Sequence, residues 1–156
     1  MGHIHQYGVR CSWSGSTGVG YEAYSRDHEA GPTANGATLS LSSDPAFRGD
    51  PERLNPEQLL VLAAASCQLL SFLAVAARAR LDVVGYEDDA VGEMPEDNLP
   101  VRITRISLRP RITMAGPASE ERVRHLVQVA HRECYIANSL KTDIDLDPTI
   151  IFATPR

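Results

Sequence analysis

The stretch NPEQLLVLAAASC, residues 55–67, opens the longest apolar segment of the chain. Asn55 is a good N-cap, Pro56 suits the first helical position, and Glu57 complements the positive end of the helix dipole. Sequence rich in Ala and Leu continues the pattern, so we predict one long helix that ends near residue 80. Polar residues interrupt the apolar run, which favours a buried core helix over a membrane span.

The segments on both sides of this helix read as short strands joined by turns. A second helix is expected after Ser119, with Glu120 and Glu121 in its first turn and apolar residues at helical spacing up to Cys134. Strands are expected at residues 7–13, 21–24, 37–41, 82–91, 101–114 and 144–147. The order predicts an α+β fold, antiparallel sheets around two helices, as a single domain over residues 1–156.

The composition of the chain limits the classes of function that we expect for it. The chain has 156 residues, 43% of them hydrophobic and 22% charged, with a formal net charge of -5 and no basic run, so we expect no nucleic-acid partner. Its start lacks a basic region followed by a long apolar region, so we expect no signal peptide. Three cysteines are an odd count, and a secreted disulfide scaffold would usually use more in a shorter chain, which favours a reducing, cytoplasmic environment. The interrupted apolar stretch also leads us to expect no membrane partner.

Cys67 and Cys134 each lie in a helical pattern, 67 residues apart. If the fold brings them together, one thiolate could attack a peroxide and the other thiol could trap the sulfenic acid as a disulfide. The plain alternative is a pair of buried, inert core cysteines. Cys11 lies in a predicted strand and is interpreted as structural. His131 and Cys134 are three residues apart, but zinc normally needs three or four ligands, so no metal is expected.

Three separated motifs resemble those of the OsmC/Ohr family of thiol-dependent peroxidases, and of its OsmC-like subgroup. The segment at residues 55–60 that leads to Cys67 resembles the first cysteine motif of that family. Glu133-Cys134 and the following residues 136–140 resemble the second. The loop at residues 43–50 resembles the loop that carries the active-site arginine.

This resemblance implies an intertwined homodimer with long central helices and active sites at the dimer interface. It implies reduction of organic hydroperoxides without a metal or bound cofactor, and a dithiol reductant, either a dihydrolipoyl protein or thioredoxin. By position, Cys67 is the peroxidatic thiol and Cys134 the resolving thiol. Arg48 and Glu57 are the polar pair that orients them, and Arg53 competes with Arg48 for this role.

Two residues depart from the family pattern. Gln68 follows the first cysteine where an aromatic residue is common, and Tyr135 follows the second where many members have proline. The spacing of Glu57 and Cys67 carries a further prediction, because ten residues of helix at about 1.5 Å each separate them by roughly 15 Å. We therefore expect Glu57 to reach the thiol site of a partner chain through antiparallel pairing of the long helices.

Two other functions fit the same scaffold. A redox-inactive protein could hold a small apolar ligand at the dimer interface and keep its thiols unreactive. A thiol redox sensor could form the same disulfide but use it to alter partner binding. A measurement of thiol reactivity distinguishes the first alternative from a peroxidase. A test for multiple turnovers with a reductant distinguishes the second alternative from a peroxidase.

Overall fold

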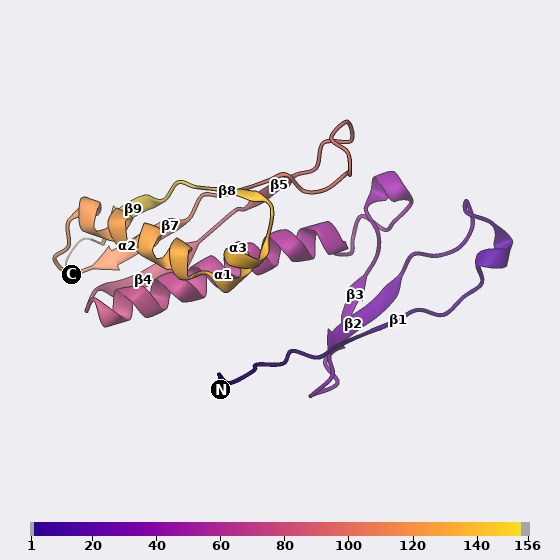
Figure 1. The fold of residues 1–156 in the computed structure, drawn as a ribbon, viewed down its shortest axis with the longest axis horizontal. Helices are drawn as coiled ribbons and strands as arrows, with labels where there is room; N and C mark the ends of the chain where they lie inside the picture. Colours follow the sequence, from indigo (N-terminus) through magenta and orange to yellow (C-terminus); the bar gives the residue numbers. More distant parts are fainter. Residues whose placement is uncertain (1, 154–156) are drawn as a thin grey trace. The chain divides into compact units, whose positions relative to one another are not determined.

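The structure is a computed structural model that describes residues 2–153 of the chain. The chain divides into two compact units, Met1–Leu59 and Leu60–Arg156, hereafter unit 1 and unit 2. Figure 1 shows the elements of both units along the chain. The α+β class is confirmed, and the single domain predicted over residues 1–156 stays a prediction.

Unit 1 contains one antiparallel sheet in the order β1-β2-β3, formed by Val9–Ser12, His28–Pro32 and Leu39–Leu41. The returning strand predicted at residues 21–24 is wrong, because β2 pairs with β1 instead. Residues 21–24 form a turn in which the N–H groups of Ala23 and Tyr24 donate to the Gly20 carbonyl. Short 3-10 helices at Thr17–Val19 and Pro45–Phe47 complete the connections.

The long helix α1 spans Pro56–Arg78, as predicted from the sequence. Asn55 caps it in a reciprocal arrangement: the Gln58 N–H donates to Asn55 Oδ1 at 2.8 Å, and the Asn55 N–H donates to Gln58 Oε1 at 3.0 Å. This capping box satisfies two backbone groups that the helix itself leaves free. The predicted N-cap is therefore confirmed, together with a partner that we did not predict.

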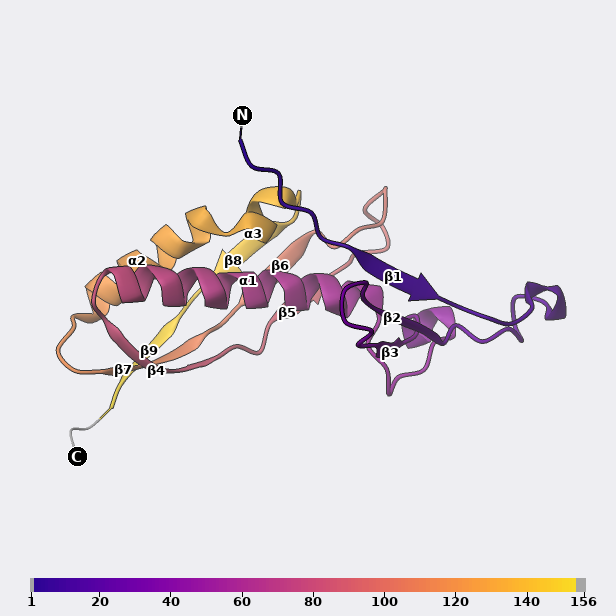
Figure 2. The same ribbon diagram turned by 90° about the horizontal axis from the view of Figure 1, so that it is seen from below.

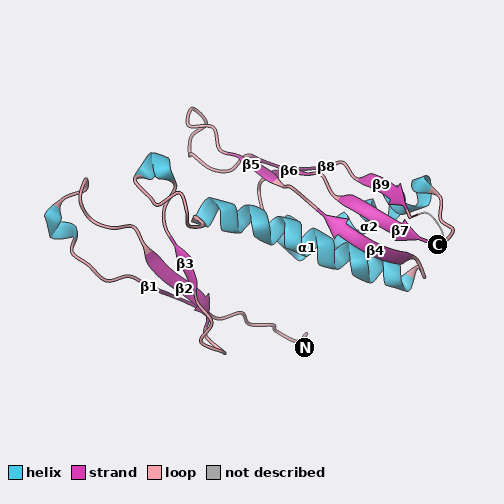
Figure 3. Ribbon diagram, turned by 180° about the vertical axis from the view of Figure 1, so that it is seen from behind, coloured by secondary structure: helices cyan, strands magenta, loops and turns pink. Residues whose placement is uncertain are grey.

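Unit 2 contains two three-stranded sheets, ordered β4-β7-β9 and β5-β6-β8 (Figure 3). The strands are Asp82–Glu87, Val91–Glu93, Arg105–Leu108, Arg111–Ala115, Asp143–Leu146 and Thr149–Phe152, numbered β4 to β9. Each sheet is mixed, because β6 pairs with β8 and β7 with β9 in parallel, whereas the other two pairings are antiparallel. The sequence predicted antiparallel sheets only.

Two long predicted strands are each divided. Residues 82–91 form β4 and β5, and residues 101–114 form β6 and β7. Between β6 and β7, the Arg109 N–H donates to the Asp88 side chain instead of to a strand, and Pro110 has no N–H to donate. The divided segment contributes strands to two different sheets. The apolar alternation continues across the division, so it gave no indication of it.

Helix α2 spans Glu120–Glu133 and lies beside α1 in both views of Figures 1 and 2. Ser119 is its N-cap, as predicted, and its side chain accepts from the Arg122 N–H at 3.2 Å. The predicted helix over Cys134 is wrong in one respect. Cys134 is extended, with a ψ of 110°, so it ends α2 and caps a separate short helix, α3, at Tyr135–Ser139.

The core of unit 2 forms where one face of α1 meets the sheets and α2. Two buried clusters make it up: Phe72, Val75, Ala76, Ile112, Met114, Val123, Val127 and Ala130, and Ala64, Ile103, Ile106 and Leu108. By length and composition alone α1 could cross a membrane, a test that the core helix of a soluble protein also passes. Its other face, with Leu62, Leu70 and Leu73, is exposed in the single chain.

Candidate active site

The fold of unit 2 brings the two predicted redox cysteines together. Cys67 lies in the middle of α1, and Cys134 lies at the junction of α2 and α3. Both are free thiols, and each lies close enough to the other to shift its pKa. Two sulfurs from segments far apart in the sequence therefore lie within reach of each other.

The start of α3 supplies hydrogen-bond donors to both sulfurs. The N–H groups of Tyr135 and Ile136 lie beside the Cys67 sulfur and lower its pKa. The Ala137 N–H donates to Cys134 Sγ at 3.5 Å, so Cys134 is the N-cap of this helix. The first N–H groups of a helix have no partner within the helix. Here Cys134 Sγ accepts from one of them, and two more lie beside the Cys67 sulfur.

These contacts shift the pKa values of the two thiols in opposite directions. Burial raises the pKa of Cys67, but hydrogen bonds from the Ile136 N–H, the Cys134 thiol and the Tyr135 N–H outweigh it and lower the pKa below that of an ordinary thiol. Ser71, one helical turn further along α1, adds a hydrogen bond in the same direction. Burial above all raises the pKa of Cys134 to about 11. Cys67 is thus the more acidic of the two thiols, and Cys134, with its raised pKa, keeps its proton at neutral pH.

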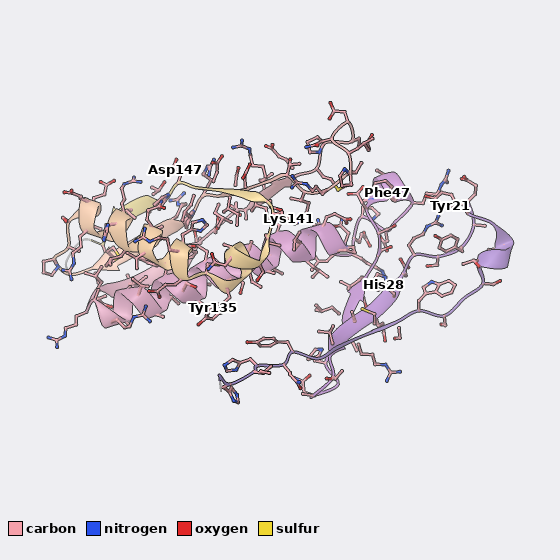
Figure 4. All side chains as sticks on the ribbon, viewed as in Figure 1. Tyr21, His28, Phe47, Tyr135, Lys141 and Asp147 are labelled. Carbon is pink, nitrogen blue, oxygen red and sulfur yellow. The ribbon has the colours of Figure 1, made fainter. Side chains whose placement is uncertain are left out.

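The two cysteines also differ in their exposure to solvent. Cys67 is half-buried, whereas Cys134 is only 1% exposed. Tyr135, labelled in Figure 4, is 80% exposed directly beside Cys134 in the chain. A solute that reaches this site therefore contacts the Cys67 sulfur first, because Cys134 is almost completely buried.

The predicted polar residues lie in unit 1. Arg48 has left-handed backbone with a φ of 67°, and its guanidinium forms an ion pair with Glu22 rather than with Glu57. Arg53 contacts two carboxylates, with Nε 3.2 Å from Asp50 and a terminal nitrogen 3.7 Å from Asp27. Glu57 follows Pro56 in the first turn of α1 and has no ion pair within residues 2–153. The roles predicted for Arg48 and Glu57 stay predictions.

Unit 1 also contains an open, mostly apolar cavity of about 330 Å³. Its lining residues include Trp13, Tyr24, Arg26, His28 and Pro56. The Arg26 guanidinium stacks 3.7 Å from the centre of the Tyr24 ring, which fixes one wall. A small apolar or aromatic group could enter this space.

The remaining cysteine and the histidines form no further site. Cys11 lies on β1, in the strand predicted for it, and is exposed; its interpretation as structural stays a prediction. Across the part of the chain that the structure describes, no three His, Cys, Asp or Glu side chains gather in a way that could hold a metal ion.

Sequence reasoning identified both cysteines but missed the groups that set their acidity. Ser71 could have been found from its spacing, since it lies four residues after Cys67 and a helix brings such positions together. The donors from Tyr135 and Ile136 are backbone groups, and no side-chain motif marks them.

Known proteins resemble this chain in sequence and in fold. A family model described as OsmC-like protein matches residues 49–149. No curated protein matches the chain. Among solved structures, an OsmC-like protein of unknown function from Vibrio cholerae is 26% identical, with a TM-score of 0.84 over 94% of this chain and 100% of that one.

Two further solved structures are organic hydroperoxide resistance proteins, and at their low identity they show the fold alone. The one from Elizabethkingia anophelis is 14% identical, with a TM-score of 0.70 over 98% of this chain and 100% of that one. The one from Legionella pneumophila is 14% identical, with a TM-score of 0.68 over 96% and 99%.

Proposed function

Because the chain belongs to the OsmC-like protein family, we propose that it is a thiol-dependent peroxidase that reduces organic hydroperoxides with two cysteines. The observation that supports this most is the proximity of Cys67 and Cys134, whose pKa values are shifted in opposite directions. A peroxidatic cysteine must be a thiolate and accessible, and a resolving cysteine must be close to it.

The reaction begins with the thiolate of Cys67. Its sulfur attacks the distal oxygen of the hydroperoxide, the O–O bond breaks, and the departing alkoxide takes a proton to become an alcohol. Cys67 is then a sulfenic acid. The Cys134 sulfur attacks it, forming the disulfide and releasing water, and the Cys134 thiol proton leaves with the hydroxyl group. An external dithiol returns both cysteines to the reduced state. No metal or cofactor takes part.

A homodimer completes the site in this proposal. The exposed face of α1 carries Leu62, Leu70 and Leu73, which is unfavourable in water and suits contact with the same face of a second chain. Antiparallel pairing of two such helices would bring Glu57 of one chain toward Cys67 of the other. Arg48 would then exchange Glu22 for Glu57 and the thiolate, and Arg53 remains its competitor.

The apolar surroundings of Cys67 favour organic hydroperoxides over hydrogen peroxide as substrates. Stopped-flow oxidation of the reduced protein should be faster with cumene hydroperoxide than with hydrogen peroxide. Equal rate constants for the two peroxides would contradict this preference and leave the two-cysteine chemistry standing.

The direct test is titration of the reduced protein with one equivalent of cumene hydroperoxide, followed by intact mass and peptide mapping. We expect stoichiometric consumption, loss of the two thiol hydrogens and a Cys67–Cys134 linkage. In Cys134→Ser, a sulfenic acid on Cys67 should be trapped by dimedone. Cys11→Ser is the matched control, since it removes an exposed cysteine and should react like the wild type. No reaction, with all thiols still free, would contradict the proposal.

A small-ligand-binding protein is the second candidate function, and the apolar cavity lined by Trp13 and Tyr24 favours it. It predicts unreactive thiols and a ligand retained through purification, which native mass spectrometry would detect. A redox sensor would form the same disulfide but use it to alter partner binding, and multiple efficient turnovers with a physiological reductant would favour the peroxidase. A cytoplasmic location stays a prediction from the three free cysteines.

A further inference from the structure

The apolar cavity of unit 1 takes no part in the proposed thiol chemistry. Its volume of about 330 Å³ falls at the lower end of the range for sites that bind small molecules, about 300–1,000 Å³. Aromatic rings form part of its lining, since Trp13 and Tyr24 meet edge to face with their ring centres 6.2 Å apart. These rings offer an apolar ligand a surface on which to stack.

Hydrogen bonds to backbone carbonyls hold the walls of this cavity in place. The Trp13 indole N–H donates to the Ser25 carbonyl at 2.7 Å, and His28 Nδ1 donates to the Arg26 carbonyl at 2.9 Å. Ser42, which also lines the cavity, is 0% exposed. A cavity whose walls are already fixed loses little conformational freedom when a ligand binds, which favours affinity.

Arg26 is the only permanently charged side chain among the described residues that line the cavity. Its guanidinium lies over two tyrosine rings, 3.7 Å from the centre of Tyr24 and 4.7 Å from the centre of Tyr21. One terminal nitrogen donates to the Tyr21 carbonyl at 2.6 Å, and the other donates to the Tyr24 carbonyl. These contacts fix the orientation of the guanidinium and use two of its five N–H groups.

This cation has no carboxylate partner within residues 2–153. The acid next to it in the sequence, Asp27, lies 3.7 Å from a terminal nitrogen of Arg53 instead and does not line the cavity. A positive charge beside an apolar space favours a ligand that carries a negative charge on an apolar body. A carboxylate suits a guanidinium best, because its two oxygens match the spacing of the N–H groups.

We propose that the apolar cavity of unit 1 binds a small aromatic carboxylate. The ring of the ligand lies against Trp13 and Tyr24, and its carboxylate accepts hydrogen bonds from the free N–H groups of Arg26. A neutral ligand leaves the guanidinium without a counter-ion, and a cationic ligand is repelled by it. This inference does not rest on the proposed peroxidase function, since it involves neither Cys67 nor Cys134.

Trp13 is the only tryptophan of the chain, so its fluorescence reports binding at this cavity directly. The full chain is titrated with phenylpropionate and, separately, with phenylpropanol, phenylpropylamine and propionate. We expect phenylpropionate to bind with a Kd at least about tenfold lower than that of the alcohol, the amine or the acid without a ring. Added sodium chloride should weaken binding of phenylpropionate more than binding of phenylpropanol, because salt screens the charge of Arg26.

A variant tests the role of Arg26. Arg26→Gln should raise the Kd for phenylpropionate at least about tenfold and change the Kd for phenylpropanol by less than about twofold. Arg10→Gln is the matched control, since Arg10 is exposed on β1 and does not line the cavity, so both Kd values should equal those of the wild type. The comparison of ligands on the wild type decides the matter even if Arg26→Gln does not fold.

Several results would overturn the inference. Equal or tighter binding of the alcohol or the amine would show that Arg26 does not select a carboxylate, and so would wild-type affinity in Arg26→Gln. No change in Trp13 fluorescence with phenylpropionate would show that the cavity does not bind it. If the fluorescence changes instead when the protein alone is diluted, a second copy of the chain fills the cavity. Peroxide consumption is measured separately, so failure of this inference and failure of the proposed function are distinguishable.

Discussion

At the scale of single residues, the acidity of Cys67 depends on the donors around its sulfur, and Ser71 is the one side-chain hydroxyl among those identified. Removing it in Ser71→Ala should raise the pKa of Cys67. Peroxidase activity requires the thiolate, so activity rises with pH through this pKa and then levels off. The acid limb of the profile should therefore move to higher pH. We expect a loss of about two- to fivefold at pH 6 and none at high pH, measured as the rate of peroxide consumption.

The control for this prediction is Ser66→Ala, which removes a neighbouring serine that is exposed on α1. Its pH profile should match that of the wild type. A uniform loss of activity at every pH in Ser71→Ala would mean that Ser71 supports the fold rather than the thiolate.

Single residues also show where sequence reasoning stops. The cysteine pair could be predicted because its motifs are local and specific. The ion pair of Arg48 with Glu22 could not, because it joins residues whose proximity is set by the path of a loop.

At the scale of elements, the proposed disulfide would change the start of α3. In the reduced protein the Ala137 N–H donates to Cys134 Sγ, and the N–H groups of Tyr135 and Ile136 lie beside the Cys67 sulfur. A disulfide sulfur carries no charge and is a weaker acceptor. Hydrogen exchange at these three amides should therefore be faster in the oxidised protein, by about tenfold or more.

Hydrogen–deuterium exchange with mass spectrometry would measure this change in a peptide covering residues 134–140. Cys134→Ser is the control, since it cannot form the internal disulfide and should show no such acceleration after treatment with peroxide. Equal exchange in reduced and oxidised wild type would contradict the coupling.

The start of α1 offers a separate prediction about stability. Asn55→Ala removes one half of the capping box with Gln58. It should destabilise the fold by about 1 kcal/mol and lower the melting temperature by about 2–4 °C. Differential scanning calorimetry would measure this, with Glu52→Ala in the preceding loop as a control expected to melt like the wild type.

The helices were predictable because their signals are local. Asn55 and Ser119 mark the starts, and periodic apolar residues mark the lengths. Strand pairing was not, since β2 and β9 were missed and the parallel pairs of β8 and β9 join segments distant in sequence. The proline between Arg109 and Arg111 was the only local sign in the sequence that the long predicted strand is divided into two.

At the scale of the whole molecule, the exposed face of α1 should hold the proposed homodimer together. Leu70 is 63% exposed in the single chain and lies in the middle of that face. Leu70→Glu would bury a charge in the dimer interface and should give monomers by size-exclusion chromatography with light scattering. Leu99→Glu is the control, since Leu99 is also exposed but lies in a loop, and it should leave the dimer intact.

The same apolar face would make the activity of each chain depend on the concentration of the protein. If each active site needs residues from two chains, association and folding share one equilibrium, and mass action governs both. Dilution should then lower the activity per chain and the melting temperature together. A cell that makes more of this protein would gain in two ways, with more copies and a larger working fraction of each, so its peroxide-removing capacity would rise faster than its expression.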